Sequence, residues 1–133
     1  SRTSKRVYGK IRNGRGIVME HKLKLQETYY NYMKNGTKQI ELRLYDEKRK
    51  LINVSDIIKF YKEPNLDEYF EARVVELLRY DNFKDLIDDF DIKLLASKDS
   101  TKEELLSDLE KYYSKDKQSK YGVIGIRIEI ISK

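Results

Sequence analysis

Three charged side chains, those of Lys38, Glu41 and Arg43, lie on or beside a segment whose apolar pattern predicts a β-strand. Apolar residues occupy every second position of residues 40–44, so Glu41 and Arg43 project together from the other face, roughly 7 Å apart. Lys38 follows Gly36, which is expected to end a helix, and its ammonium can reach the same side of the sheet. Because charge is costly to bury without a partner, we expect the three side chains to line one polar pocket.

Each of the three side chains has a binding role and a plainer structural one. Lys38 can contact a phosphate or carbonyl when charged, or act as a base if burial lowers its pKa toward neutrality. Glu41 can accept a hydrogen bond from the exocyclic amine of a base, while the planar fork of Arg43 holds a phosphate or carbonyl. In the structural alternative, Lys38 is an exposed lysine after a turn. Glu41 and Arg43 then only neutralise each other, which is worth about 0–1 kcal/mol on a surface.

Length and composition restrict the kinds of site that the chain can build. A chain of 133 residues fits one domain that buries its own core without disulfides or structural metals. It has no cysteine and one histidine, His21, which argues against thiol chemistry and zinc; we expect no metal and no cofactor. We interpret His21 as a strand-edge residue without catalytic duty. No apolar run approaches the ~20 residues of a membrane span and no signal-peptide pattern is present, so we expect a cytoplasmic protein without a membrane partner.

The net charge of +5 is concentrated at one end of the chain. Residues 1–18 hold six of the 28 basic residues and no acid, which leaves 22 basic against 23 acidic residues in the remainder. These first residues also lack hydrophobic periodicity, and Met19 stands where the periodic pattern begins. We therefore expect residues 1–18 to be a basic leader, either disordered and phosphate-binding or not native, and residues 19–133 to form the domain.

Hydrophobic periodicity predicts the order of elements. Alternating apolar residues predict strands at residues 21–25, 39–45, 56–62, 69–80 and 121–131, the longest of which should contain a bulge or bend. Helical spacing predicts helices at residues 26–35 and after residue 82, a capping box opens another at residues 100–103, and residues 114–120 should form a polar loop. This order predicts an α+β fold: a small, mostly antiparallel β-barrel of five or six strands, partly closed, with helices packed around one side.

The chain resembles the ASCH (activating signal cointegrator homology) domain family, which has a PUA-like fold. Four segments within residues 21–131 carry the resemblance: Met33-Lys34-Asn35-Gly36, Gly36-Thr37-Lys38-Gln39-Ile40-Glu41-Leu42-Arg43, Val54-Ser55-Asp56-Ile57-Ile58-Lys59-Phe60, and Tyr113-Ser114-Lys115 with Tyr121-Gly122-Val123-Ile124-Gly125-Ile126. The resemblance implies a small β-barrel with a cleft between barrel and helices, lined by the Lys-x-x-Glu-x-Arg strand. It also implies that this cleft binds RNA or a modified nucleoside.

Some family members are similar in sequence but catalytic, and this gives an alternative function. They hydrolyse the amide of an N4-acylated cytidine with a lysine, a threonine and a glutamate. Lys38 matches the lysine, but Glu41 stands where these amidohydrolases have threonine, and only Asp99 or Glu103 can take the place of the glutamate. By this alternative Lys38 and Glu41 are the catalytic candidates.

Three further features of the sequence bear on a site. Among the 11 tyrosines, Tyr61 and Tyr121 are the candidates for stacking on a base in the cleft, while those on helices are expected to pack against the barrel. The strand starting at residue 56 has Ser55 where the family usually has glycine, which should alter a turn rather than a site. The acidic run at residues 85–91 is a candidate protein-interaction surface or magnesium site, and a solvated helix face is the favoured interpretation.

Overall fold

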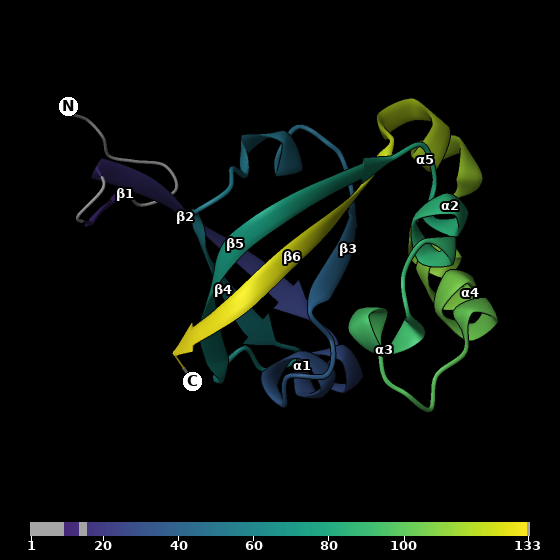
Figure 1. Cartoon of the computed structure of the whole chain (residues 1–133), viewed down its shortest axis with the longest axis horizontal. Helices are drawn as coiled ribbons and strands as arrows, with labels where there is room; N and C mark the ends of the chain where they lie inside the picture. Colours follow the sequence, from purple (N-terminus) through teal and green to yellow (C-terminus); the bar gives the residue numbers. More distant parts are fainter. Residues whose placement is uncertain (1–9, 14–15, 133) are drawn as a thin grey trace.

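The computed structural model describes residues 10–13 and 16–132, which form six strands and five α-helices (Figure 1). The strands are β1 (Lys10–Asn13), β2 (Gly16–Leu25), β3 (Ile40–Leu44), β4 (Ile57–Lys62), β5 (Tyr69–Tyr80) and β6 (Val123–Ser132). The helices are α1 (Glu27–Lys34), α2 (Phe83–Asp88), α3 (Ile92–Leu95), α4 (Lys102–Tyr112) and α5 (Lys115–Tyr121). No helix of this described part is long and apolar enough to cross a membrane.

The strands form one curled sheet in the order β1-β2-β4-β5-β6-β3. The β2–β4 pair is parallel and every other pair is antiparallel, and β5 carries register shifts at Glu71/Ala72 and Val74/Glu76 where a bulge was predicted. The five strands β2 to β6 curl into a half-barrel, which confirms the predicted α+β, PUA-like fold. Because β2 and β3 stand at the two ends of this curl, the barrel is open between them, and the open seam faces the helices (Figure 1).

Two groups of buried side chains hold the sheet and the helices together. Inside the half-barrel, Phe60 of β4 and Phe70 of β5 lie opposite each other with ring centroids 5.4 Å apart, and Tyr30 of α1 packs on Phe70. The second group joins β3 to the helices through residues such as Ile40 and Leu86. Fully burying an apolar side chain of this size contributes about 1.5–3 kcal/mol, so these contacts fix β3 against the helical side.

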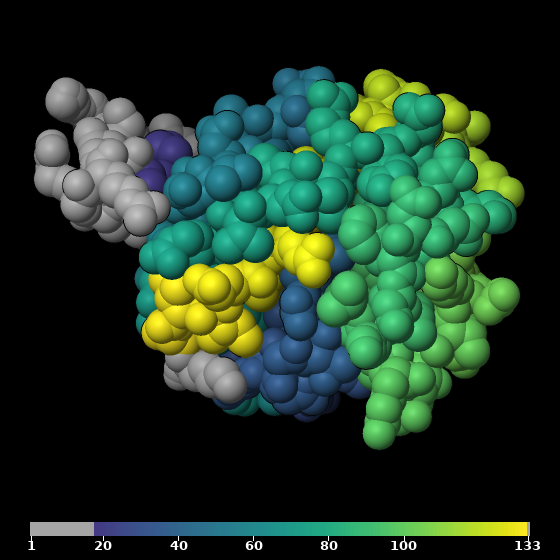
Figure 2. All heavy atoms as spheres, viewed as in Figure 1, coloured from purple at the N-terminus to yellow at the C-terminus, as the bar shows by residue number. Residues whose placement is uncertain are grey.

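The helices α2 to α5 cover one side of the molecule, where Figure 2 shows a green mass with the yellow-green of α5 at its top. α4 begins at a capping box in which Thr101 and Glu104 bond each other's backbone, one residue later than predicted. The prediction of a loop at residues 114–120 is wrong, because α5 occupies that segment. This polar helix is anchored by Gln118, which is 2% exposed; its side-chain oxygen accepts a hydrogen bond from the Phe83 backbone nitrogen at 2.9 Å.

The first strands lie where a leader was expected. β2 begins at Gly16, five residues before the predicted strand start, and β1 pairs with it from Lys10↔Met19 to Asn13↔Gly16. Residues 10–13 and 16–18 are therefore extended strand. The other residues of the expected leader, 1–9 and 14–15, lie outside the described residues, and the boundary of the domain at residue 19 stays a prediction.

The turn before β4 requires a backbone conformation that serine disfavours. Ser55 has φ of +81° in the left-handed region, and its backbone nitrogen donates to the carbonyl of Val74 at 2.8 Å, so the turn is held in place by the sheet. Glycine, the residue that the resemblance to the ASCH family implies here, has no Cβ to clash in this conformation.

Replacing Ser55 by glycine is expected to raise the free energy of unfolding by about 0.5–1 kcal/mol, because relief of the left-handed strain outweighs the added entropy of the unfolded chain. Urea unfolding of the two proteins measures the difference. Ser107→Gly is the matched control: Ser107 lies inside α4, where glycine costs about 0.5 kcal/mol relative to serine. A loss of stability in both variants would show that Ser55 is not strained.

Candidate ligand-binding site

Lys38, Glu41 and Arg43 converge on one side of β3, as the sequence predicts. The Lys38 ammonium is 2% exposed and donates hydrogen bonds to the carbonyls of Ile40 at 2.7 Å and Leu95 at 2.8 Å. Its nitrogen also lies 3.3 Å from Glu41 Oε1. An ammonium has three N–H groups, so these three acceptors account for all of them. Lys38 is therefore a buried structural cation rather than an exposed lysine after a turn.

Arg43 is the member of the group that keeps free donors. Its Nε donates to Glu41 Oε2 at 2.6 Å, and its Nη2 donates to the carbonyl of Lys24 on β2. The second bond crosses the open seam between β3 and β2 and ties the two strands together. A guanidinium has five N–H groups. Two of them are used within the described part of the chain, and the other three donate to no described residue.

Burial and the attraction between opposite charges act in opposite directions on the pKa values of Lys38 and Glu41. Burial lowers the pKa of Lys38, an effect that the negative charge of Glu41 opposes. For Glu41, burial alone would raise the pKa, but the charges of Arg43 and then Lys38 outweigh burial and hold the pKa below its usual range. Glu41 is thus the anion between two buried basic side chains, and with Lys38 and Arg43 both protonated the group carries a net charge of one positive unit.

The group borders a cavity of about 340 Å³ that lies between the open seam and the helices. Its lining comes from the ends of β2 and β4, the start of α1, β3 and the last turns of α4: Lys24, Leu25, Gln26, Tyr29, Lys38, Glu41, Leu42, Arg43, Glu63, Leu105, Asp108, Leu109, Tyr112 and Tyr113. This volume falls at the low end of small-molecule pockets, which span roughly 300–1,000 Å³.

Tyrosines and a carboxylate form the wall that faces the charged group. The Tyr29 hydroxyl donates to Asp108 at 2.9 Å, and the Lys38 nitrogen lies 5.6 Å from the centre of the Tyr29 ring. Burial, then the hydrogen bond to Asp108, raises the pKa of Tyr29, so the phenol stays protonated. Tyr29 and Tyr113 pack against the core between β3 and the helices, as the sequence-based interpretation of the helix tyrosines expects, and together with Tyr112 they also line the cavity.

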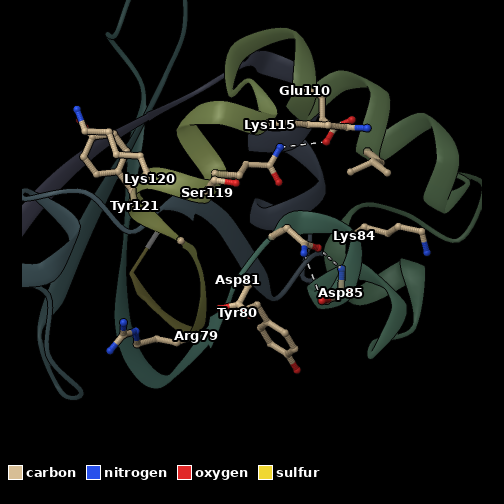
Figure 3. A pocket seen from close by; sticks show the side chains of 14 residues that line it. Arg79, Tyr80, Asp81, Lys84, Asp85, Glu110, Lys115, Ser119, Lys120 and Tyr121 are labelled. Atoms are coloured by element: carbon tan, nitrogen blue, oxygen red, sulfur yellow. Dashed lines mark hydrogen bonds between the residues drawn. The ribbon is translucent and has the colours of Figure 1, made fainter.

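Tyr61 and Tyr121, the tyrosines predicted to lie in the cleft, are elsewhere. Tyr61 stands on the outer face of β4, where its ring stacks on that of Tyr69 at a centroid distance of 5.2 Å. Tyr121 lines a separate open groove of about 890 Å³ between the end of β5 and helices α4 and α5 (Figure 3). For Tyr61, apolar alternation places the side chain on a face of the sheet but does not say which of the two faces borders a cavity. Tyr121 was predicted to begin a strand, but it is the last residue of α5, and β6 begins only at Val123.

The residues offered as a catalytic acid do not join the charged group. Asp99 is exposed and lines a neighbouring hollow of about 260 Å³, and Glu103 is exposed on α4. Lys38 has no N–H group directed at the cavity, so it has no free proton or lone pair for general catalysis as it stands.

Two other predictions concern His21 and the acidic run at residues 85–91. His21 is not a strand-edge residue: it lies inside β2, is 4% exposed, and its Nε2 is 2.8 Å from Asp56 Oδ2. Burial on the inner face of the sheet accounts for this pairing, because a buried imidazole needs a polar partner. The acidic side chains of residues 85–91 are exposed, in keeping with a solvated helix face.

Comparisons with known proteins agree with this fold and motif. A family model described as the ASCH domain matches residues 23–132. The structure is similar to the crystal structure of hypothetical protein PH0355, with a TM-score of 0.75 and 34% identity over 85% of this chain and 100% of that chain. It is also similar to the solution NMR structure of protein PF0455 from Pyrococcus furiosus, with a TM-score of 0.68 and 31% identity over 85% of this chain and 98% of that chain.

A comparison with curated proteins found no match. The family match nevertheless covers most of the chain, and the two solved structures are more than 30% identical to it over nearly their whole length. The chain therefore belongs to the ASCH domain family.

Proposed function

We propose that this protein binds RNA and seats one nucleoside, modified or unmodified, in the cavity beside Arg43. The observation that carries the proposal is the free side of the Arg43 guanidinium, which is fixed by Glu41 and by the Lys24 carbonyl and opens on a cavity of about 340 Å³. A guanidinium held in this way is preorganised to donate to a base carbonyl or a phosphate. The association of ASCH domains with RNA binding supports the choice of ligand.

The walls of the cavity fit a nucleobase better than a purely charged ligand. Tyr29, Tyr112 and Tyr113 offer aromatic surface, and Asp108 and Gln26 add a carboxylate and an amide to the lining. Base rings stack on tyrosine, and polar groups at their edges pair with fixed donors and acceptors. We infer that Lys38 and Glu41 are positioning residues that hold Arg43 in place, since their own polar atoms are engaged with the protein.

Arg43→Lys is the sharpest test, because lysine keeps the charge and loses the planar fork. The affinity for a labelled single-stranded octanucleotide, measured by fluorescence anisotropy, is expected to fall about 10- to 100-fold, the equivalent of a lost bidentate contact. In a thermal-shift assay, the four common nucleosides and N4-acetylcytidine are expected to stabilise the parent protein and not the variant.

The control is Arg127→Lys, a substitution of the same kind on β6, where Arg127 pairs with Glu76 at 3.6 Å, away from the cavity. Unchanged affinity in Arg43→Lys, with both variants folded, would overturn the proposal. The same samples are assayed for release of cytidine from N4-acetylcytidine. Turnover that Lys38→Ala abolishes would replace binding with hydrolysis as the function.

A further inference from the structure

Two tyrosines form an aromatic pair on the outer face of the sheet. Tyr61 of β4 and Tyr69 of β5 are directly opposite in the register of the two strands, and their rings stack at 5.2 Å with an angle of 29° between their planes. Tyr69 is 46% exposed and Tyr61 is half-buried. The inner residues of the same strands, Phe60 and Phe70, fill the core, so the tyrosines are not needed to close it.

Lysines lie beside this pair on the same face, together with Glu20 of β2 and Glu71 of β5. Lys24 on β2 pairs in register with Tyr61, Lys22 pairs with Lys59, and the Lys59 ammonium lies 5.3 Å from the centre of the Tyr69 ring. Lys59 is held by Glu20 at 3.4 Å. Lys22 and Lys24 are exposed and have no ion pair with any residue that the structure describes. Two free cations beside exposed aromatic faces match the alternation of phosphate and base along a single strand of RNA.

The face is continuous with the proposed nucleoside cavity. Lys24 belongs to both: it lines the cavity, its carbonyl accepts the bond from Arg43, and it lies next to Tyr61 across one strand spacing, about 4.8 Å. A strand of RNA that leaves the cavity along β2 therefore meets the tyrosine pair next. The groove of Figure 3 lies at the other end of β5, so it is not next on this path.

We propose that the outer face formed by Lys22, Lys24, Tyr61 and Tyr69, here called the tyrosine platform, binds the nucleotides of a single-stranded RNA adjacent to the one in the cavity. The proposal rests on the proposed function for the identity of the ligand. It adds a second contact surface with its own residues and its own specificity: the platform takes any base, because every base has a π-face.

Removing the rings tests the platform. The double variant Tyr61→Ala/Tyr69→Ala is expected to bind a labelled single-stranded octanucleotide about 5- to 100-fold more weakly, the measured range for loss of base stacking. Tyr61→Phe/Tyr69→Phe keeps the rings and is expected to keep the affinity. Tyr80→Ala, at the opposite end of β5, is the matched control and should leave the affinity unchanged.

Removing the charges of Lys22 and Lys24 tests whether the RNA phosphates run along the tyrosine platform. Each phosphate contact to single-stranded RNA contributes about 0.7 to the slope of log affinity against log salt. Lys22→Gln/Lys24→Gln is therefore expected to make that slope shallower by about 1.4 units. Lys115→Gln/Lys120→Gln removes the same charge from the groove of Figure 3 and is expected to leave the slope unchanged. A slope change in the groove variant and not in the platform variant would overturn the proposal.

A short ligand separates this proposal from the proposed function. A mononucleoside fills only the cavity, so the thermal shift that it produces should survive in the platform variants and disappear in Arg43→Lys. If the alanine variant binds the octanucleotide as tightly as the parent protein while Arg43→Lys does not, the platform is overturned and the cavity stands. If no nucleoside gives a shift but the alanine variant loses octanucleotide affinity, the cavity is overturned and the platform stands.

Discussion

Replacing Glu41 by glutamine is expected to lower the free energy of unfolding by about 3–5 kcal/mol. The substitution keeps the shape of the side chain and removes the one negative charge between two buried cations. Lys38 is 2% exposed and the Arg43 side chain 12%, so water cannot screen their repulsion well. The loss is measured by urea unfolding at neutral pH, where Glu41 is ionised because Arg43 and Lys38 hold its pKa low.

The control for this prediction is Glu47→Gln. Glu47 also pairs with a lysine, Lys50 at 3.4 Å, but its side chain is 86% exposed, and surface pairs of this kind contribute about 0–1 kcal/mol. A double variant, Lys38→Met/Glu41→Gln, restores the original net charge of the group and should recover more than 1 kcal/mol of the loss, an energetic coupling expected of residues in contact. A cost below about 1 kcal/mol for Glu41→Gln would mean that water reaches the charges.

The sequence predicts the charged group because a strand places alternate residues on one face, whatever the rest of the fold does. Glu41 and Arg43 are two residues apart on β3, and Lys38 is close enough to join them, so their convergence is a local property. Apart from the Ile40 carbonyl, their backbone partners are not local. The Leu95 carbonyl that holds Lys38 is 57 residues away, and Lys24, across the seam, is 19 residues from Arg43.

The cavity walls were beyond prediction for the same reason. Tyr29 lines the same cavity as Arg43 only because α1 packs at the open seam, and Asp108 bonds Tyr29 across a separation of 79 residues. On a helix, both a core residue and a cavity residue occupy the apolar stripe, so the 3.6-residue repeat cannot separate them. The hydroxyl of Tyr29 was the useful signal, because a tyrosine on that stripe needs a hydrogen-bond partner for its hydroxyl. Asp108 is the acidic residue on the inner side of α4.

The helix α5 shows how one buried polar side chain can decide local structure. Residues 114–120 contain no apolar side chain, which is why a loop was predicted. The side-chain nitrogen of Gln118 donates to Glu110 and to the carbonyl of Tyr113, both at 3.0 Å, and its oxygen accepts from Phe83. Because its side-chain oxygen and nitrogen both have hydrogen-bond partners, Gln118 can occupy the interior position that a leucine would hold in an ordinary amphipathic helix.

Asp56→Ala is expected to lower the free energy of unfolding by about 3–5 kcal/mol, because one buried carboxylate serves three donors. Oδ1 accepts from the Met19 backbone nitrogen at 3.1 Å, and Oδ2 accepts from the Asn53 backbone nitrogen at 2.9 Å and lies 2.8 Å from His21 Nε2. Asp56 is 4% exposed, so water cannot replace the lost acceptor. Hydrogen bonds to a charged group contribute about 1.5–3 kcal/mol each, and orphaned buried donors add to the loss.

Asp56 links β2, the turn before β4 and β4 itself. Its loss should therefore weaken the whole β2–β4 pairing at the edge of the seam, and not a single contact. Hydrogen exchange can detect this: the amides of residues 20–25 and 57–62, which pair β2 with β4, should exchange faster in Asp56→Ala, while those of β5 and β6 keep their protection. Asp99→Ala is the control, since that exposed carboxylate makes no hydrogen bond to any described residue. Equal stability of the two variants would show that Asp56 does not organise the seam, and the fixed position of Arg43 over the cavity would then need another source.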